Sequence, residues 1–475
     1  MSSASAVGLL AVFVVDLVDL FFLSLLGEEE IAAAVGFAGT VLFFTISLSV
    51  GLFIGTSALV SQAIGAGDDE AARRLTVNGM MLGVLCSLVV VSFLWPFLPE
   101  VMTLLGAEGR THQLAVDYLR IIIPTMPLMN IGMQCGAILR SLGDVRRSMR
   151  NNVYAGIVNA VLDPILIFGL ALGIEGAALA TVSARMVMAG VGLLDVFGYH
   201  KMGHAFRWSL FFRDVLPLSR IAVPAVLTNL ATPLGTAYVT VTMAQFGVAA
   251  MAGNAIIARI TPLAFTLFYS LSGAVGPIVG QNYGAKRFDR LRETIFASMK
   301  FLGAYTLVLW GLFLIGEEWI VVVFDASPEA AELISVFCLL LVPLAYFQGI
   351  LFLANAAFNN LGKALYATAS NIGRATVGTI PFVYLGAVWY GAEGALIGQS
   401  IGAAIIAVLA VILCLALINR LEQHHLSGVE SDVKPPVGGR VRMPLWPFVS
   451  SRMVNASSIE EEPSAADDKN RKGGA

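Results

Sequence analysis

Long apolar stretches recur along almost the whole chain, and this recurrence most constrains its fold. Each is close to the roughly 20 residues that a helix needs to cross the hydrocarbon core of a bilayer. We count twelve, at approximately 5–26, 34–61, 78–98, 118–139, 152–172, 176–197, 215–244, 250–279, 298–317, 333–358, 366–388 and 395–419. Charged residues make up 13% of the chain, against about 25% in soluble domains. These observations predict an all-α integral membrane protein with twelve transmembrane helices.

The loops between the predicted helices differ in charge. The even-numbered loops contain clusters of basic residues, such as Arg146, Arg147 and Arg150, whereas Arg110 is the one basic residue of the odd-numbered loops. Basic loops stay on the cytoplasmic side of bacterial inner membranes. The pattern therefore predicts a multi-pass protein of the bacterial inner membrane with both termini in the cytoplasm. The formal net charge of −3 gives no basic bias that would indicate nucleic-acid binding.

The second half of the sequence repeats landmarks of the first half after a shift of about 219 residues. The matched landmarks are LVSQAIGAG at 59–67 and IVGQNYGAK at 278–286, Pro124 and Pro343, Gly143 and Gly362, Asn152 and Asn371, and, one residue out of step, GIEGA at 173–177 and GAEGA at 391–395. Because each repeat contains an even number of helices, the two halves should be parallel and related by an axis along the membrane normal, with a cleft between them.

The repeat predicts two pseudo-symmetric six-helix bundles at 1–200 and 214–420, joined by a cytoplasmic linker at 201–213. The segment 421–475 is rich in Ser, Pro, Gly and charged residues, a composition that is typical of disordered tails. We expect a monomer whose substrate binds centrally. Prolines expected to mark helix kinks are Pro124, Pro127, Pro164, Pro262, Pro343 and Pro381.

The predicted helices of the first half contain polar side chains that lipid disfavours. Asp16 and Asp19 are three residues apart in the first helix, and Asn159 precedes Asp163 by four in the fifth, so each pair shares a helix face. At 1.5 Å per residue, Asp163 lies roughly 17 Å from the cytoplasmic start of its helix. Asp19 and Thr181 reach the same outer level. Because intramembrane ionisable groups are usually functional, these five residues are candidates for a cation site.

Six segments form an ordered set of motifs: LVDLFFLSLLG at 17–27, SQAIGAG at 61–67, LRSLGD at 139–144, NAVLDPILIFG at 159–169, GIEGAALATVSA at 173–184 and GQNYGA at 280–285. In this order the chain, over about 1–420, resembles the multidrug and toxic compound extrusion (MATE) family, and most closely its DNA-damage-inducible (DinF-like) bacterial branch. The resemblance implies export of organic, often cationic or amphipathic compounds, driven by inward flow of protons or sodium. It also implies that Asp19, Asn159, Asp163 and Thr181 couple the cation in the N-terminal lobe.

The candidate residues fit two coupling ions. A carboxylate in a dry lobe can take up a proton from outside and release it inside, whereas two carboxylates with amide and hydroxyl oxygens also suit Na+. The sequence leaves H+ and Na+ open and calls for no cofactor. Asp163 could instead pair with Arg185, and Thr181 could donate to its own helix backbone. The second half lacks matching carboxylates, so coupling is expected in the first lobe, and Arg259 and Arg374 are expected to pair with backbone carbonyls.

Substrate contacts are expected from adaptable, aromatic and amide side chains. Methionines of the fourth helix give a soft surface, and the tenth helix offers amides. The candidate substrate-binding residues are Tyr118, Met126, Met129, Met133, Gln348 and Asn355, with further aromatic candidates at Phe43, Phe44, Phe265, Phe268 and Tyr269. Packing within a lobe or against lipid is the alternative for each, and for Tyr118 the alternative is an anchor at the membrane interface.

These observations predict a secondary active antiporter that exports drugs, toxins or metabolites by alternating access between two lobes. A flippase of a lipid-linked or amphipathic precursor is a related alternative, although such proteins tend to have fourteen helices and a basic cavity. A polytopic membrane enzyme is the alternative from another class. It is not favoured, because the histidines are few and scattered in loops. The chain departs from the family in lacking an early proline in its first helix, and a longer N-terminus is expected.

Overall fold

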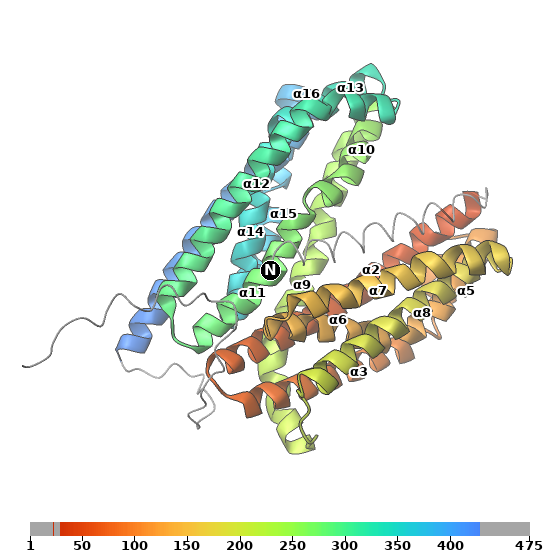
Figure 1. The fold of residues 1–475 in the computed structure, drawn as a ribbon. Coiled ribbons are helices and arrows are strands. Elements are labelled where there is room, and N and C mark those ends of the chain that lie inside the picture. Colours follow the sequence, from red (N-terminus) through yellow and green to blue (C-terminus); the bar gives the residue numbers. More distant parts are fainter. Residues whose placement is uncertain (1–21, 23–28, 428–475) are drawn as a thin grey trace, which may run out of the picture. The chain divides into compact units, whose positions relative to one another are not determined.

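The computed structural model describes Phe22 and residues 29–427, which consist of helices joined by short turns (Figure 1). The predicted first helix at 5–26 lies almost entirely outside the described residues, as does the predicted tail beyond residue 427. The structure therefore tests the second to the twelfth of the predicted helices.

Helices of the first half follow the predicted spans from the second to the sixth. The α-helices are α2 (Glu29–Gly65), α3 (Asp69–Leu94), α4 (Leu98–Leu104), α5 (Gly109–Ile122), α6 (Met126–Ser141), α7 (Val145–Pro164) and α8 (Gly173–Leu193). Short 3-10 or π-helical segments continue α5, α7 and α8, namely η1 (Ile123–Thr125), η2 (Ile165–Gly169) and η3 (Leu194–Tyr199). In Figure 1, α3, α6, α7 and α8 lie side by side, and each of them contacts at least one of the others.

The second half follows the predicted spans from the seventh to the twelfth. Its helices are α9 (Trp208–Ala244), α10 (Val248–Ala264), α11 (Thr266–Gly284), α12 (Phe288–Val323), α13 (Pro328–Val336), η4 (Phe337–Leu341), α14 (Val342–Asn360), α15 (Ala364–Ala375) and α16 (Ile380–Leu426). The last of these contains a reversal at Tyr390 and Gly391, whose backbone angles are not helical. This reversal separates the eleventh and twelfth predicted spans.

Length and apolar composition allow eight helical segments of the described chain to cross a membrane, or nine if the bent pair α10 and α11 forms one span. One of the eight, Ala364–Leu426, has 63 residues and contains the reversal described above, so it covers two predicted spans. Only 6% of the apolar window of α12 is buried inside the protein. Such a surface needs lipid as its solvent, so the protein is an integral membrane protein.

Prolines lie at interruptions of the helices, as predicted. Pro124 lies in η1, Pro164 immediately precedes η2, and Pro343 is the second residue of α14, which follows η4. Pro262 lies in the last turn of α10, which meets α11 at a bend of 40°. Proline interrupts a helix because it has no backbone N–H to donate. The remaining two predicted prolines lie in the first turns of α6 and α16.

The internal repeat is visible in the backbone itself. Residues with positive φ recur at matched positions of the two halves, and the pairs are Gly67 and Lys286, Gly106 and Asp325, Gly143 and Gly362, and Gly173 and Gly391. Positive φ is uncommon for residues other than glycine. Because Lys286 and Asp325 adopt it where the first half has glycine, the two halves share the geometry of these turns and not only their sequence.

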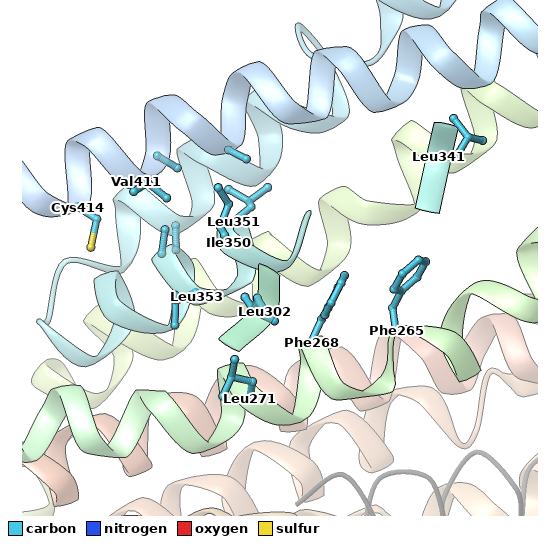
Figure 2. Packing of buried hydrophobic residues seen from close by; sticks show 14 of the residues in the cluster. Phe265, Phe268, Leu271, Leu302, Leu341, Ile350, Leu351, Leu353, Val411 and Cys414 are labelled. Atoms are coloured by element: carbon cyan, nitrogen blue, oxygen red, sulfur yellow. The ribbon is translucent and has the colours of Figure 1, made fainter. Parts of the chain in front are cut away.

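Each half has its own hydrophobic core, and we call the two halves the first lobe (residues 29–199) and the second lobe (208–426). In the second lobe, side chains from α11, α12, α14 and α16 meet around Phe268, Leu302 and Leu351, which are at most 2% exposed (Figure 2). Further clusters lie within the first lobe. The start of α9 lies within the predicted linker, and the predicted domain limits stay predictions. Separate cores permit each lobe to move as a unit.

Asp144 joins three elements at one end of the first lobe. It caps the N-terminus of α7, and its carboxylate accepts from the Arg147 backbone at 3.1 Å, the Arg147 side chain at 2.6 Å and His200 at 3.0 Å. Burial acts to raise the pKa of the Asp144 carboxyl, but the hydrogen bonds from Arg147 and His200 outweigh burial and lower the pKa below its usual value. This carboxylate therefore stabilises the fold in its charged form.

We expect Asp144→Ala to destabilise the protein more than Asp68→Ala. Both aspartates cap a helix, and losing an N-cap costs about 1 kcal/mol, but Asp144 also loses Arg147 and His200. Because folding lowers the pKa of Asp144, its charge contributes stability above the ordinary pKa of 3.8, and this contribution is lost as the pH falls through the folded-state pKa. Thermal unfolding in detergent measures both effects. Equal destabilisation by the two variants at neutral pH would contradict this account.

Candidate cation site and substrate cavity

The carboxyl group of Asp163 lies inside the first lobe, in the last turn of α7. Asp163 is fully buried, and Asn159, one turn earlier in α7, is 5% exposed. The side-chain nitrogen of Asn159 donates to both carboxylate oxygens at 3.3 Å. The structure thus brings these two candidates together, as their spacing of four residues predicts.

The helix is interrupted directly after this carboxylate. Pro164 has no N–H, so the carbonyl oxygen of Ala160 lacks its usual helical donor. The π-helical segment η2 follows, in which the Leu170 nitrogen donates to the Ile165 oxygen across five residues. Single π-turns inside helices are frequent at functional sites. The interruption leaves a backbone oxygen without its helical donor in the turn that carries Asp163.

Two close contacts fix the register between α7 and α8. A Cβ on Gly176 would lie 2.7 Å from the backbone of Leu166, and a Cβ on Gly192 would lie 3.1 Å from the side-chain nitrogen of Asn151. Residues near the end of α7 therefore pair with the start of α8, and residues near its start pair with the end of α8. The two helices are antiparallel neighbours with one consistent register.

This register places Thr181 of α8 at the level of Asp163. The threonine hydroxyl donates to the Ala177 backbone oxygen at 3.1 Å. This is the hydrogen bond to its own helix that the sequence offered as the alternative role of Thr181. A hydroxyl that donates in this way keeps its oxygen lone pairs as acceptors. Thr181 can therefore bond its own helix and still present an oxygen to a cation.

A third helix reaches the same level. Arg185 of α8 donates to the Ile122 oxygen at 3.1 Å and to the Thr125 hydroxyl at 2.9 Å. Since α5 and α8 run in the same direction, this contact places Tyr118, one turn before Ile122, level with Thr181. The tyrosine is 9% exposed and belongs to the core of the first lobe, so it is not an interfacial anchor. Tyr118 stays a predicted substrate residue, and its place in the fold is level with the cation candidates.

Four of the candidates thus share one level of the first lobe, while Asp16 and Asp19 lie outside the described residues. Arg185 makes its hydrogen bonds to the chain between α5 and α6, and no ion pair between it and Asp163 occurs among the described residues. Within the same part of the chain, no group of three or more His, Cys, Asp or Glu could hold a metal ion. The groups at this level, a carboxylate, an amide and hydroxyls, are of the types that suit a proton or a hard cation such as Na+.

The predicted substrate residues lie apart from one another. Met126 is fully buried in the core of the first lobe and Met129 is 7% exposed, so both pack within the lobe, whereas Met133 is partly exposed. Gln348 and Asn355 of α14 belong to the second lobe, where Gln348 is partly exposed and Asn355 is 7% exposed. Of the aromatic candidates, Phe265 and Phe268 form part of the second-lobe core (Figure 2).

A cavity of about 520 Å³ lies between α2 of the first lobe and α9 of the second lobe. Its lining residues are Phe43, Thr232, Pro233, Thr236, Ala237, Thr240 and Val241. The threonines recur every four residues and so form one stripe on α9. Sequence reasoning named Phe43 but missed the threonines, although their spacing was visible. An open, almost entirely apolar cavity of this size with an aromatic edge fits a drug-sized molecule.

The lobes meet through matched hydrogen bonds. The side-chain nitrogen of Gln62 donates to the Asn360 backbone oxygen at 2.7 Å, and that of Gln281 donates to the Ser141 backbone oxygen at 2.7 Å. Donors and acceptors are both related by the repeat, so the contact has approximate two-fold symmetry. We call the end of the lobes where these loops lie the arginine-rich end. It comprises loops 66–68, 142–144, 200–207, 285–287 and 361–363 with the helix starts that follow them, which carry Arg73, Arg74, Arg146, Arg147, Arg213 and Arg290.

Glycines permit this contact. A Cβ on Gly65 would fall on the Gln281 carbonyl oxygen, and a Cβ on Gly284 would fall on the Gln62 carbonyl oxygen. These glycines also match in the repeat. The ends of α2 and α11 therefore cross with their backbones touching, which a larger residue at either position would prevent.

A buried ion pair ties the lobes at the same end. The carboxylate of Asp214, at the start of α9, accepts from Arg74 at 2.9 Å and from Asn78 at 2.8 Å, and both donors lie on α3. Asp214 is 4% exposed. The cavity residues Thr232 to Val241 lie on later turns of α9, farther from this contact. The two lobes are thus closed at the arginine-rich end and leave a cavity toward the opposite end.

Comparison with known proteins identifies one family. The family model MatE matches residues 4–165 and again residues 224–385, which are the two repeats. A FAD transporter of Shewanella oneidensis is 28% identical over 408 residues, covering 84% of this chain and 90% of that protein. The multidrug export protein MepA of Staphylococcus haemolyticus is 24% identical over 434 residues, covering 90% and 94%.

Solved structures show the same architecture. A crystal structure of the Vibrio cholerae MATE transporter VcmN superposes with a TM-score of 0.84 at 25% sequence identity, covering 89% of this chain and 97% of that chain. An outward-facing multidrug resistance transporter of the MATE family has a TM-score of 0.83 at 24% identity. The fold is the twelve-helix, two-lobe bundle that the sequence predicts.

Proposed function

This chain belongs to the MatE family of membrane transporters, which are not enzymes, and we propose that it is a secondary active antiporter. In this proposal it exports organic, cationic or amphipathic compounds in exchange for inward H+ or Na+, as the DinF-like branch does. The protein lies in the bacterial inner membrane as a monomer, with both termini and the arginine-rich end in the cytoplasm. It acts on small molecules without a cofactor and does not bind nucleic acid.

One observation carries the proposal: the fully buried carboxylate of Asp163, held by Asn159 in the interior of the first lobe. A charge in such a place is costly and persists where it has a function. Occupation by a proton or Na+ neutralises the carboxylate, so the two states of the site differ in charge. A coupling site needs such a difference between its two states. The membrane potential supplies the driving force, since each cation that moves inward gains about 2.3 kcal/mol per 100 mV.

The contact between the lobes supports alternating access. The lobes are closed at the arginine-rich end, so with that end in the cytoplasm the observed state opens outward. Binding of the cation in the first lobe then favours separation of Gln62 and Gln281 from their partners and closure of the opposite end. The lobes can exchange these states because each has a separate core.

The cavity between α2 and α9 is the proposed substrate site. Phe43 offers an aromatic face to flat organic cations, and the threonine stripe offers hydroxyl oxygens. Relatives carry the names multidrug export protein and FAD transporter. These names support a substrate range that includes planar aromatic compounds and is not limited to cations.

We expect Thr236→Phe to weaken binding of a dye such as ethidium by about tenfold, because the larger side chain fills the cavity. Fluorescence anisotropy with the purified protein measures the affinity. Val223→Phe is the matched control, since Val223 is an exposed residue of α9 that does not line the cavity. Equal affinities for the two variants would place the substrate elsewhere.

Inverted membrane vesicles test the proposal as a whole. Ethidium uptake into the vesicles is measured while a proton gradient or a sodium gradient is imposed separately. We expect one gradient to drive uptake, and the effective gradient identifies the coupling ion. If neither gradient moves the dye, the antiporter proposal is wrong. Gradient-independent translocation of a labelled lipid precursor in the same vesicles would favour the flippase alternative.

A further inference from the structure

Arg374 is a buried cation with an unsatisfied side-chain nitrogen in the described part of the chain. It lies near the end of α15 and is 8% exposed, and its Nε has no hydrogen-bond partner in the described part of the chain. Arg185 in the first lobe is equally buried, yet it donates to the Ile122 oxygen and the Thr125 hydroxyl. The expected pairing of Arg374 with backbone carbonyls is not found among the described residues.

No carboxylate of the described chain pairs with Arg374. Helices α10, α11, α14 and α15 contain no Asp or Glu in their described sequences. Of the acids of α9 and α16, Asp214 pairs with Arg74, Glu422 pairs with Arg292, and Glu393 lies just after the reversal at Tyr390 and Gly391. A buried guanidinium without a partner carries a large desolvation penalty. Such a group persists where something outside the chain neutralises it.

Aromatic side chains lie on helices around α15. Helix α14 packs against both α11 and α15, and it carries Phe352, which faces Tyr269 of α11. The Tyr269 ring packs on the ring of Phe352, with centroids 4.9 Å apart and planes inclined by 33°. Tyr269 is 40% exposed, so this aromatic pair has an open side. An anionic group held by Arg374 would have an aromatic surface next to it.

We propose that Arg374, with Tyr269 and Phe352, forms an anion subsite in the second lobe that takes the carboxylate or phosphate group of an aromatic, amphipathic compound. Guanidinium binds both groups through two parallel hydrogen bonds, and a phenol hydroxyl can add a third. The inference rests on the proposed function in that the bound compound is the exported one. The inference adds organic anions to the cations of the proposed substrate class. The acidic first lobe by itself would disfavour such anions.

Binding to the purified protein tests this inference without any gradient. The probe is fluorescein, an aromatic dianion, and the protein is held in nanodiscs of phosphatidylcholine. We expect Arg374→Gln to weaken fluorescein binding by about tenfold or more, the loss that follows from removing a charge-assisted hydrogen-bond pair. Arg374→Lys should lose less, because it keeps the charge but not the planar fork. Ethidium affinity should stay unchanged in both variants.

Arg292→Gln is the matched control, since it removes an arginine of the same lobe that is already paired with Glu422. Tyr269→Phe, which keeps the ring, should weaken fluorescein binding by a few fold. It is the variant that tests the inference if Arg374→Gln does not fold.

Nanodiscs with phosphatidylglycerol separate the sources of the anion. Retention of this lipid that depends on Arg374, without fluorescein binding, would assign the site to a lipid headgroup.

The inference is overturned if neither fluorescein binding nor retention of phosphatidylglycerol depends on Arg374. That result would leave the antiporter proposal standing, provided that a gradient still drives ethidium transport. Conversely, Arg374-dependent fluorescein binding by a protein that no gradient can drive would support the subsite and reject the antiporter.

Discussion

Replacing Gly284 by alanine is expected to reduce transport by about tenfold or more. The added Cβ would fall on the carbonyl oxygen of Gln62, so the lobes could not close fully at the arginine-rich end. Overpacking of this kind costs about 1–3 kcal/mol, and each 1.4 kcal/mol is about a factor of ten in the balance between two conformations. The variant should therefore populate the state that is closed at the arginine-rich end far less than the wild type.

Gly273→Ala is the matched control, because Gly273 lies on the same helix, α11, and its Cβ would meet nothing within 4 Å. Gly65→Ala should reproduce the Gly284 effect through the symmetric contact with Gln281. The measurement combines transport with labelling of a cysteine introduced in the loop 66–68, which should become more reactive. Normal transport and unchanged labelling in both Gly65→Ala and Gly284→Ala would show that this contact does not control access.

Asp163→Asn is expected to abolish gradient-driven efflux while leaving the fold intact. Asparagine has nearly the same shape and can keep the contact with Asn159, but it neither titrates nor carries a charge for Na+. Gradient-driven transport should fall to the level of vesicles that lack the protein. Binding of ethidium in the absence of a gradient should persist. Transport and equilibrium binding, measured on the same preparation, separate a lost coupling site from a misfolded protein.

Asp117→Asn provides the control for this experiment. Asp117 lies on α5, next to Tyr118, but its carboxylate is about half exposed and sits 3.7 Å from Arg120. Exposed pairs of this kind contribute little, so transport should be unchanged. Intact efflux by Asp163→Asn under the gradient that drives the wild type would move the coupling site away from α7.

Much of the site could be predicted from short-range rules. The spacing of four residues between Asn159 and Asp163 already put both side chains on one helix face, and the helix rise gave the depth of Asp163. Tyr118 could not be assigned in this way. Its level depends on how α5 packs on α8, which is set by the contact of Arg185 with Ile122 and Thr125. That contact joins residues about sixty positions apart, beyond the reach of any periodicity.

The sequence by itself determined the membrane class, the helices and the repeat. These follow from local physics: lipid admits backbone only as helices with satisfied hydrogen bonds, and a duplicated sequence repeats its turns, as the positive φ values at Gly143 and Gly362 show. Only the tertiary structure decided which end is closed, that Gln62 and Gln281 hold the lobes together, and that the Arg374 Nε has no partner among the described residues. The physical reason is that packing between distant segments determines which polar groups find a partner, and the sequence pattern of one helix does not contain that information.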